Sequence, residues 1–184
     1  GAYFALLKEW NEKINLVSRK SFDTSFEYHF ADSLHIAQVA HDHLYGRQLR
    51  DLGTGAGFPG VVFAIRYPEI PVTLYEKLEK RRIYLTDVIE KLGLKNVTLQ
   101  GALPEVKYRD VFTARAVFPL AEFFPFMKRH FVTGGRLVVN MGSATEIPEL
   151  PNGFRSLKQD QYTLPGDAGS RKIAVYELVP RETM

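Results

Sequence analysis

The first 45 residues follow the period of amphipathic helices. Apolar side chains at positions 4, 6, 7, 10 and 14 recur at spacings of three and four, which predicts a helix over residues 4–14. A second series with phenylalanines at positions 22, 26 and 30 predicts a helix over residues 21–39. We therefore expect an N-terminal helical portion that ends near Gly46.

From position 46 onward, short apolar runs alternate with helical periods. The expected strands cover residues 48–52, 72–76, 97–100, 111–116 and 136–140, and the expected helices cover residues 59–66, 79–92 and 121–131. This alternation favours a parallel sheet with both faces covered. Residues 154–164 and 172–179 also have strand patterns. The loop between them is too short for a crossover helix, so we expect an antiparallel hairpin at the sheet edge.

Length and composition fit one ordinary domain. The chain has 184 residues, of which 45% are hydrophobic and 24% are charged. We expect a single domain over residues 1–184, with a helical cap at residues 1–45 and a core at residues 46–184. Apolar runs are far shorter than the ~20 residues that cross a bilayer. The sequence also lacks a signal-peptide pattern, so we expect a cytoplasmic protein.

Two counts narrow the possible chemistry. The sequence has no cysteine, which excludes thiolate nucleophiles and cysteine-ligated metals. The formal net charge is only +3, which permits a nucleic-acid partner without proving one. The positive charge is concentrated at Lys77, Lys80, Arg81 and Arg82, which form either a solvated helix face or a surface that helps to dock RNA.

The segment from Asp51 to Gly60 is the strongest candidate for a ligand site. It reads Asp-Leu-Gly-Thr-Gly-Ala-Gly-Phe-Pro-Gly and joins an expected strand to an expected helix. Glycines let the backbone turn tightly and approach a ligand, and the helix offers free N–H groups. The dinucleotide fingerprint needs a glycine where Phe58 stands. A Walker loop is excluded because no Gly-Lys-Ser/Thr follows.

S-adenosylmethionine fits this loop better than a dinucleotide. It has no pyrophosphate, and its cationic sulfonium and amino-acid end favour a nearby carboxylate such as Asp51. Glu76, at the end of the second expected strand, would accept hydrogen bonds from both ribose hydroxyls. The alternative for the loop is a simple strand-to-helix connection.

Several motifs in their order resemble one family. They occupy residues 10–18 (Trp-Asn-Glu-Lys-Ile-Asn-Leu-Val-Ser), 29–34 (His-Phe-Ala-Asp-Ser-Leu), 51–60, 80–81, 113–117 (Thr-Ala-Arg-Ala-Val) and 170–175. Together they resemble the RsmG family, also called GidB or glucose-inhibited division protein B, the ribosomal RNA small subunit methyltransferase G. The resemblance implies a class I S-adenosylmethionine-dependent methyltransferase fold, Rossmann-like, with a mostly parallel seven-stranded sheet, an antiparallel C-terminal edge hairpin and an N-terminal helical portion.

The family's activity, as the resemblance implies it, is methyl transfer from S-adenosylmethionine to N7 of a guanine in 16S rRNA. The loop and the resemblance together give the expected cofactor-binding residues, which are Asp51, Gly53, Thr54, Gly55, Gly57, Phe58, Glu76, Leu103, Pro104 and Arg115. The expected substrate-binding residues are Asn15, His29, Asp32, Ser33 and Arg171. Three of these have structural alternatives: an ion pair for Arg115, and a capping or core pair for His29 and Asp32.

The expected chemistry needs no general base, because guanine N7 carries a lone pair and no hydrogen. Arg115 is the expected catalytic residue and would orient guanine or phosphate. We expect a monomer that acts on 16S rRNA or the small ribosomal subunit without a metal or a membrane. Two alternatives stay open, a methyltransferase for a small molecule and a non-catalytic or NAD-linked nucleotide-binding module.

The chain departs from the family pattern at two places. Residues 102–105 are Ala-Leu-Pro-Glu where Arg-Ala-Glu is usual, which removes a charged side chain near the expected adenine site. Met141 stands where lysine is common. We expect the loss of that lysine to weaken RNA binding without abolishing turnover, because N7 needs no base.

Overall fold

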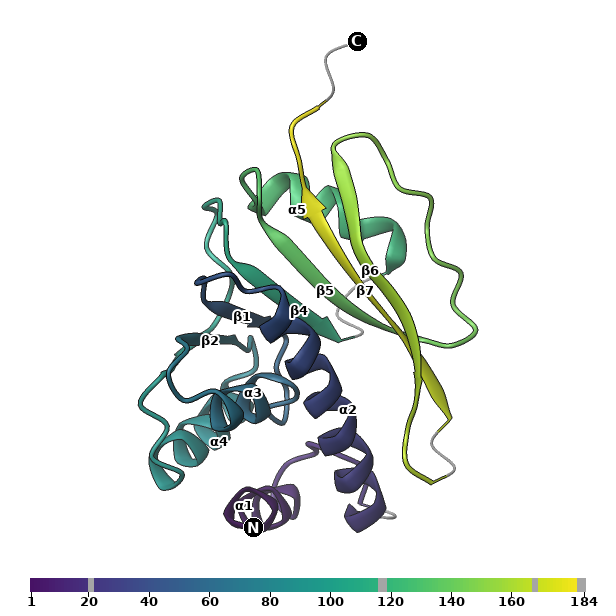
Figure 1. The fold of residues 1–184 in the computed structure, drawn as a ribbon. Coiled ribbons are helices and arrows are strands. Elements are labelled where there is room, and N and C mark those ends of the chain that lie inside the picture. Colours follow the sequence, from purple (N-terminus) through teal and green to yellow (C-terminus); the bar gives the residue numbers. More distant parts are fainter. Residues whose placement is uncertain (20–21, 116–118, 167–168, 182–184) are drawn as a thin grey trace.

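The structure is a computed structural model that describes residues 1–19, 22–115, 119–166 and 169–181. Seven strands form one sheet in the order β3-β2-β1-β4-β5-β7-β6 (Figure 1). Their bounds are β1 (Leu49–Leu52), β2 (Val72–Tyr75), β3 (Val97–Gln100), β4 (Val111–Arg115), β5 (Arg136–Gly142), β6 (Phe154–Thr163) and β7 (Ser170–Leu178). Strands β1 to β5 pair in parallel, whereas β7 is antiparallel to both β5 and β6. The expected class I topology, including the edge hairpin, is confirmed.

The helices lie close to the expected positions. They are α1 (Ala2–Asn11), α2 (Phe22–Asp42), α3 (Gly60–Arg66), α4 (Glu79–Lys91) and α5 (Phe123–His130), with a short 3-10 helix η1 (Leu120–Glu122) before α5. Helix α2 extends three residues beyond the expected end at position 39. Ser21 and Ala116, which we expected at the start of a helix and the end of a strand, lie outside the described residues.

Helix α1 ends at Asn11, three residues before its apolar period does. The Asn11 side chain is buried, and its Oδ1 accepts hydrogen bonds from the backbone N–H groups of Leu16 (2.9 Å) and Val17 (3.1 Å). These bonds turn the chain away from the helix axis. A buried polar side chain therefore overrides the periodicity that predicted a longer helix.

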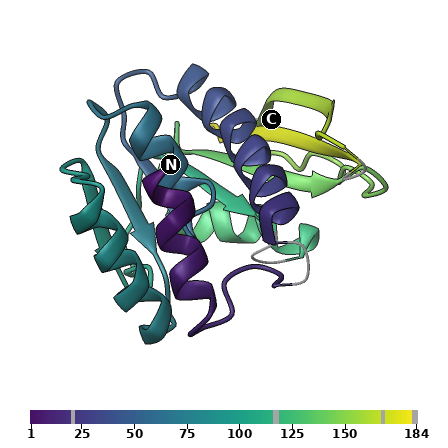
Figure 2. The same ribbon diagram turned by 90° about the horizontal axis from the view of Figure 1, so that it is seen from below.

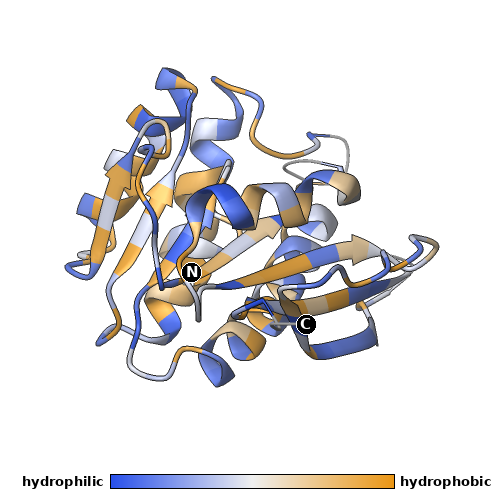
Figure 3. Cartoon of the chain, turned by 90° about the horizontal axis from the view of Figure 1, so that it is seen from above, coloured by the Kyte–Doolittle hydropathy of each residue, from blue (hydrophilic) through white to orange (hydrophobic). Residues whose placement is uncertain are grey.

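Two hydrophobic cores cover the two faces of the sheet. Alternate strand residues point to opposite faces, so Val111 and Val138 join the core beneath α1 to α4, while Phe112 and Leu137 join the core that includes α5. Figure 1 shows α2 in front of the sheet and α5 behind it. In Figure 3 the apolar colour concentrates on the strands, as expected for a sheet with both faces covered.

The N-terminal helices pack directly on the core. Figure 2 shows α1 between α4 and α2. The Tyr3 ring lies 5.9 Å from the Phe26 ring on α2, and Trp10 Nε1 donates a 2.8 Å hydrogen bond to Asp87 on α4. The cap and the sheet therefore share one hydrophobic core. The boundary that we expect at residue 45 stays a prediction.

Candidate functional site

The glycine-rich loop, residues 53–60, leads from the carboxyl end of β1 into α3. Gly53, Gly55 and Gly57 have φ angles of 61°, 58° and 102°, which glycine adopts most easily. A Cβ atom at Gly57 would lie 2.7 Å from the Tyr3 hydroxyl oxygen, so no side chain fits there. Around Gly55 the space is open, because the nearest atom, the Gly53 carbonyl oxygen, would lie 3.9 Å away. At Gly55 the backbone conformation alone requires glycine.

Two tyrosines fix this loop from outside. The hydroxyl groups of Tyr3 (2.6 Å) and Tyr84 (2.8 Å) both donate hydrogen bonds to the carbonyl oxygen of Ala56. Burial raises the pKa of both hydroxyl groups, which keeps them protonated as donors. We did not single out either residue from the sequence. The two residues of each hydrogen bond are far apart in the sequence, by 53 positions for Tyr3 and by 28 for Tyr84. No local sequence pattern therefore predicts these bonds.

Asp51 lies beneath the loop and is fully buried. Its Oδ2 accepts a 2.9 Å hydrogen bond from the backbone N–H of Gly60, and its Oδ1 accepts one of 2.9 Å from the Thr113 hydroxyl. Burial raises the pKa of this carboxyl group from 3.8 to about 7, although the hydrogen bonds that it accepts oppose the shift. Asp51 therefore couples the start of α3 to β4. The cofactor contact that we expected for Asp51 stays a prediction.

A cavity of about 740 Å³ opens at the carboxyl ends of β1, β2 and β4. Its lining residues are Leu52, Gly53, Tyr75, Glu76, Lys77, Leu78, Arg81, Gly101, Ala102, Leu103, Glu105, Arg115, Phe126, Arg129 and His130. In doubly wound sheets, ligands bind at this edge. The cavity brings together Gly53, Glu76, Leu103 and Arg115, four of the residues expected to hold the cofactor. We call it the cofactor cavity.

The remaining expected cofactor residues do not line this cavity. Thr54 is buried, and its backbone N–H donates a 3.1 Å hydrogen bond to the Tyr75 carbonyl oxygen. Phe58 is also buried, and its ring stacks on the His29 ring at 5.4 Å. Pro104 is exposed next to Leu103, which does line the cavity. The contacts that we expected for these three residues stay predictions.

Glu76 places a carboxylate on the wall of the cofactor cavity. Its side chain is buried, Oε2 accepts a 3.0 Å hydrogen bond from the Gly55 N–H, and Oε1 accepts one of 3.1 Å from the Leu78 N–H. A carboxylate has about four lone-pair positions, so each oxygen can accept one more donor. The loop thus fixes an acceptor pair that two neighbouring ribose hydroxyls would match.

The cavity as a whole fits an adenosine group. The apolar residues Leu52, Leu78, Leu103 and Phe126 line the same cavity as Glu76. An apolar wall suits a flat base, and a carboxylate beside it suits the ribose. The residues present therefore agree with the nucleoside part of S-adenosylmethionine.

Arg115, at the end of β4, connects the cofactor cavity to α2. Its Nη2 lies 2.9 Å from Nδ1 of His29, and its Nε lies 3.5 Å from Oδ2 of Asp32, which is fully buried. Burial, together with the nearby Arg115 and Arg171, lowers the pKa of His29 to about 4. The ring is therefore neutral at neutral pH, and Nδ1 accepts a hydrogen bond from the guanidinium group, which can only donate.

The edge hairpin completes this cluster from the far end of the chain. The Tyr162 hydroxyl on β6 donates a hydrogen bond to Oδ1 of Asp32 and accepts one from the amide of Asn140 on β5. Arg171 on β7 donates to the Tyr28 hydroxyl on α2. Residues 32 and 162 are 130 positions apart and residues 140 and 162 are 22 apart, so no local pattern pointed to Tyr162 or Asn140.

The expected substrate-binding residues fall into two groups. Asp32 and Ser33 have no exposed surface, and the Asp32 carboxylate forms an ion pair with Arg115. His29 and Arg171 are partly exposed beside the same cluster. Asn15 is exposed and lies in the segment between α1 and α2. Direct contact of these residues with a substrate stays a prediction.

Met141 has a structural environment of its own. Its side chain is 6% exposed and belongs to the hydrophobic core on the α5 side. It pairs in register with Lys172 of β7, whose Nζ donates a 2.8 Å hydrogen bond to the Thr145 carbonyl oxygen. The apolar side chain at position 141 therefore faces the core, not the cofactor cavity. Our expectation about its effect on RNA binding stays a prediction.

Two further searches cover only the described residues. None of their helices is long and apolar enough to cross a membrane. They also contain no group of three or more His, Asp or Glu side chains that could hold a metal ion.

Comparisons with known proteins agree with this geometry. A family model described as "rRNA small subunit methyltransferase G", GidB, matches residues 1–173. A protein of Acetivibrio thermocellus named ribosomal RNA small subunit methyltransferase G is 37% identical over 165 residues, which cover 85% of this chain and 66% of that protein. A protein of the same name from Phocaeicola vulgatus is 34% identical over 182 residues, with 96% and 80% coverage.

The fold is also found among solved structures. A crystal structure of a mutant of MtNAS in complex with S-adenosylmethionine superposes with a TM-score of 0.63 at 16% identity. The match covers 96% of this chain and 73% of that one. At this identity the likeness shows a shared fold.

Proposed function

Because the chain belongs to the rRNA small subunit methyltransferase G family, we propose that it transfers a methyl group from S-adenosylmethionine to N7 of a guanine in 16S rRNA. The chain spans 66% of the Acetivibrio thermocellus relative and 80% of the Phocaeicola vulgatus relative. The observation that carries the proposal is the cofactor cavity, where Glu76 and Arg115 lie on the walls of one space.

Glu76 would anchor the cofactor through its ribose. Both carboxylate oxygens are already oriented by backbone N–H groups, so the side chain loses little freedom when a ligand binds. Leu103 and its neighbours would cover the adenine. This arrangement supports S-adenosylmethionine as the methyl donor.

Arg115 would position the acceptor beside the donor. The neutral His29 ring and the buried Asp32 carboxylate hold the guanidinium group from the α2 side, while its own side chain lines the cofactor cavity. A fixed cation there can hold guanine or a phosphate group in line with the donor.

When bound, S-adenosylmethionine supplies an electrophilic methyl carbon, to which the N7 lone pair forms a bond while the electrons of the methyl–sulfur bond stay on sulfur. The product guanine gains a positive charge, and no proton leaves. The protein therefore needs groups that orient and exclude water, not a base. A cytoplasmic location, a monomeric state and independence from metal ions are parts of the same proposal.

The first test measures transfer of a labelled methyl group from S-adenosylmethionine to bare 16S rRNA, to small ribosomal subunits and to a panel of small molecules. We expect label in RNA, at a guanine N7. Label only in a small molecule would contradict the RNA assignment, and label in none of them would contradict the proposed activity.

The second test removes the ribose acceptor. Glu76→Ala should weaken cofactor binding by about 100-fold or more in calorimetry, because two hydrogen bonds to a charged group are lost. Glu69→Ala, an exposed glutamate in the loop between α3 and β2, is the matched control. Equal cofactor affinity in both variants would contradict the role of Glu76.

A further inference from the structure

A second, smaller cavity lies next to the cofactor cavity. It has a volume of about 520 Å³ and lies between the segment after α1 and the start of α4. Lys13, Asn15 and Arg19 line it from the first segment, and Lys80 and Arg81 line it from the second. We call it the basic groove. Because Leu78 and Arg81 line both cavities, the two adjoin.

The basic groove carries excess positive charge. Four of its lining residues are cationic and one, Glu79, is acidic, and of the cations Lys13 also lies 3.8 Å from the exposed Glu9 carboxylate. Within the described part of the chain, the side chains of Lys80 and Arg81 form no hydrogen bond or ion pair. Arg19 donates to the carbonyl oxygens of Asn11 and Glu12, which leaves its charge uncompensated.

The neighbouring charges of the same run behave differently. Arg82 donates hydrogen bonds of 2.9 Å and 2.6 Å to the carbonyl oxygens of Glu76 and Lys77. It therefore stabilises the loop beneath the cofactor cavity. The basic run that the sequence shows as one block thus divides into the structural Arg82, two cations in the groove, and Lys77, which lines the cofactor cavity.

Resting on the proposed function, we propose that the basic groove binds phosphate groups of the RNA strand that carries the target guanine. The cations are exposed or partly exposed and come from two segments about 60 positions apart, an arrangement that suits a long, hydrated polyanion. The Asn15 amide adds an uncharged donor. A strand held there runs past Leu78 and Arg81 to the cofactor cavity, so the groove fixes the register of the RNA and not its sequence.

The test uses Lys13→Gln/Lys80→Gln, because these two lysines line the basic groove and not the cofactor cavity. The matched control is Lys91→Gln/Lys95→Gln, which removes the same charge at the other end of α4. The dissociation constant for 16S rRNA is measured from low to high salt. The groove variant should bind more weakly and lower the slope of log K against log salt by about 1.5, while the control changes neither.

Three results separate the possible failures. If the wild type methylates no RNA, the proposed function fails. If it does methylate RNA but the groove variant has the same salt slope as the control, the groove proposal fails alone. Competition by polyglutamate as strong as by an oligonucleotide of equal charge would assign the groove to acidic peptides and overturn the RNA assignment. Calorimetry with S-adenosylmethionine and thermal unfolding show whether both variants are folded and bind the cofactor equally.

Discussion

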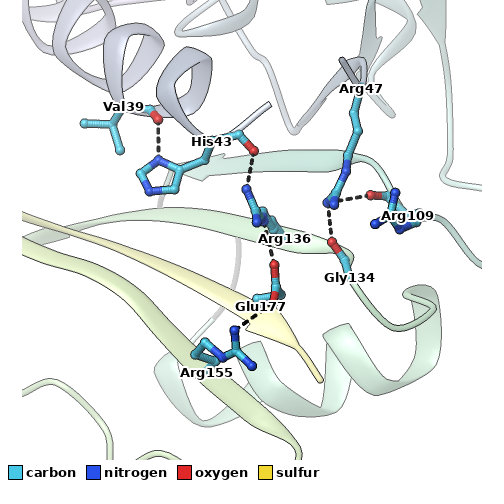
Figure 4. Close-up of polar contacts among 8 residues, drawn as sticks. All are labelled: Val39, His43, Arg47, Arg109, Gly134, Arg136, Arg155 and Glu177. Carbon is cyan, nitrogen blue, oxygen red and sulfur yellow. Dashed lines mark hydrogen bonds and ion pairs between the residues drawn. The ribbon is translucent and has the colours of Figure 1, made fainter. Parts of the chain in front are cut away.

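Arginine and glutamate side chains lie at both edges of the sheet, but their bonding differs between the amino edge and the carboxyl edge. At the amino edge, Figure 4 shows Arg136 between Glu177 and the carbonyl oxygen of His43. Both bonds are 2.8 Å long, and Arg155 approaches the other oxygen of Glu177 at 3.9 Å. The chain itself provides the partners of these charges.

At the carboxyl edge, the charged groups have partners on one side only. Arg115 contacts His29 and Asp32 toward α2, and its other side lines the cofactor cavity. Glu76 is held by two backbone N–H groups and lines the same cavity. The carboxyl edge therefore differs from the amino edge because its charged groups can still form hydrogen bonds toward the cofactor cavity. The number of charged groups does not distinguish the two edges.

The largest expected effect comes from replacing Arg136 at the amino edge and Arg115 at the carboxyl edge. Arg136→Met removes the closest partner of Glu177 and the partner of the His43 carbonyl oxygen in a nearly buried site, so the free energy of unfolding should fall by about 3 kcal/mol in urea titrations. Its methyl transfer, measured well below the melting temperature, should match the wild type. Arg115→Met should also be less stable, because Asp32 stays buried, but it should lose methyl transfer as a folded protein.

Arg155→Met is the control for this comparison. Arg155 contacts the same Glu177, but its side chain is 63% exposed, so its loss should cost less than about 1 kcal/mol. If folded Arg136→Met loses methyl transfer as completely as Arg115→Met does, the division between the two edges is wrong.

The same contrast explains what the sequence could predict. The positions of the strands, the edge hairpin and the glycine-rich loop follow from local periods and glycine spacing, and the structure confirms them, whereas the order of the strands in the sheet was not predicted. Glu76 lines the cofactor cavity because the carboxyl ends of parallel strands meet at one edge, and its contact with the ribose stays a prediction. Tyr162 could not be predicted, because an edge-strand residue gives no sign of a partner 130 positions away, and Asn140 enters the cluster only through Tyr162.

Asp51 shows a second limit of sequence reasoning. An acidic residue before the glycines suggests a ligand contact, which stays a prediction, but the sequence did not indicate that its carboxylate is also buried against Thr113 and the start of α3. The direction of one side chain depends on how strands and helix pack, and the local pattern does not contain that information.

The second prediction concerns this buried carboxyl group. Burial raises its pKa to about 7, so between pH 4 and 7 the folded protein holds a proton that the unfolded chain releases. Stability from this group is therefore complete at low pH and is lost as pH rises toward 7, by at most about 1.4 kcal/mol per pH unit. In urea titrations, wild type should lose stability relative to Asp51→Asn over this window and stay level above it.

Asp87→Asn provides a control of the opposite sign. The hydrogen bond from Trp10 is the main cause that lowers the pKa of Asp87, so its stabilising contribution is present at neutral pH and is lost as pH falls. Wild type should therefore gain stability relative to Asp87→Asn as pH rises. If the free energy of unfolding of the wild type changes between pH 4 and 7 in the same way as that of Asp51→Asn, the raised pKa of Asp51 is contradicted.

The smallest expected effect tests a charge pair at the functional edge that resembles those at the amino edge. Arg129 on α5 forms an ion pair with Glu105 in the loop after β3, and both residues line the cofactor cavity. Their side chains are 63% and 71% exposed, so water screens the pair, and Arg129→Ala should change the free energy of unfolding by less than about 1 kcal/mol. Any effect on cofactor affinity should be a few-fold and should disappear in about 1 M salt, where the Debye length is near 3 Å. A double-mutant cycle with Glu105→Ala, followed by calorimetry with S-adenosylmethionine, measures the coupling between the two residues. A salt-resistant coupling above about 2 kcal/mol would mean that this exposed pair holds the cavity wall in place, and that exposure alone does not separate structural from dispensable charges at this edge.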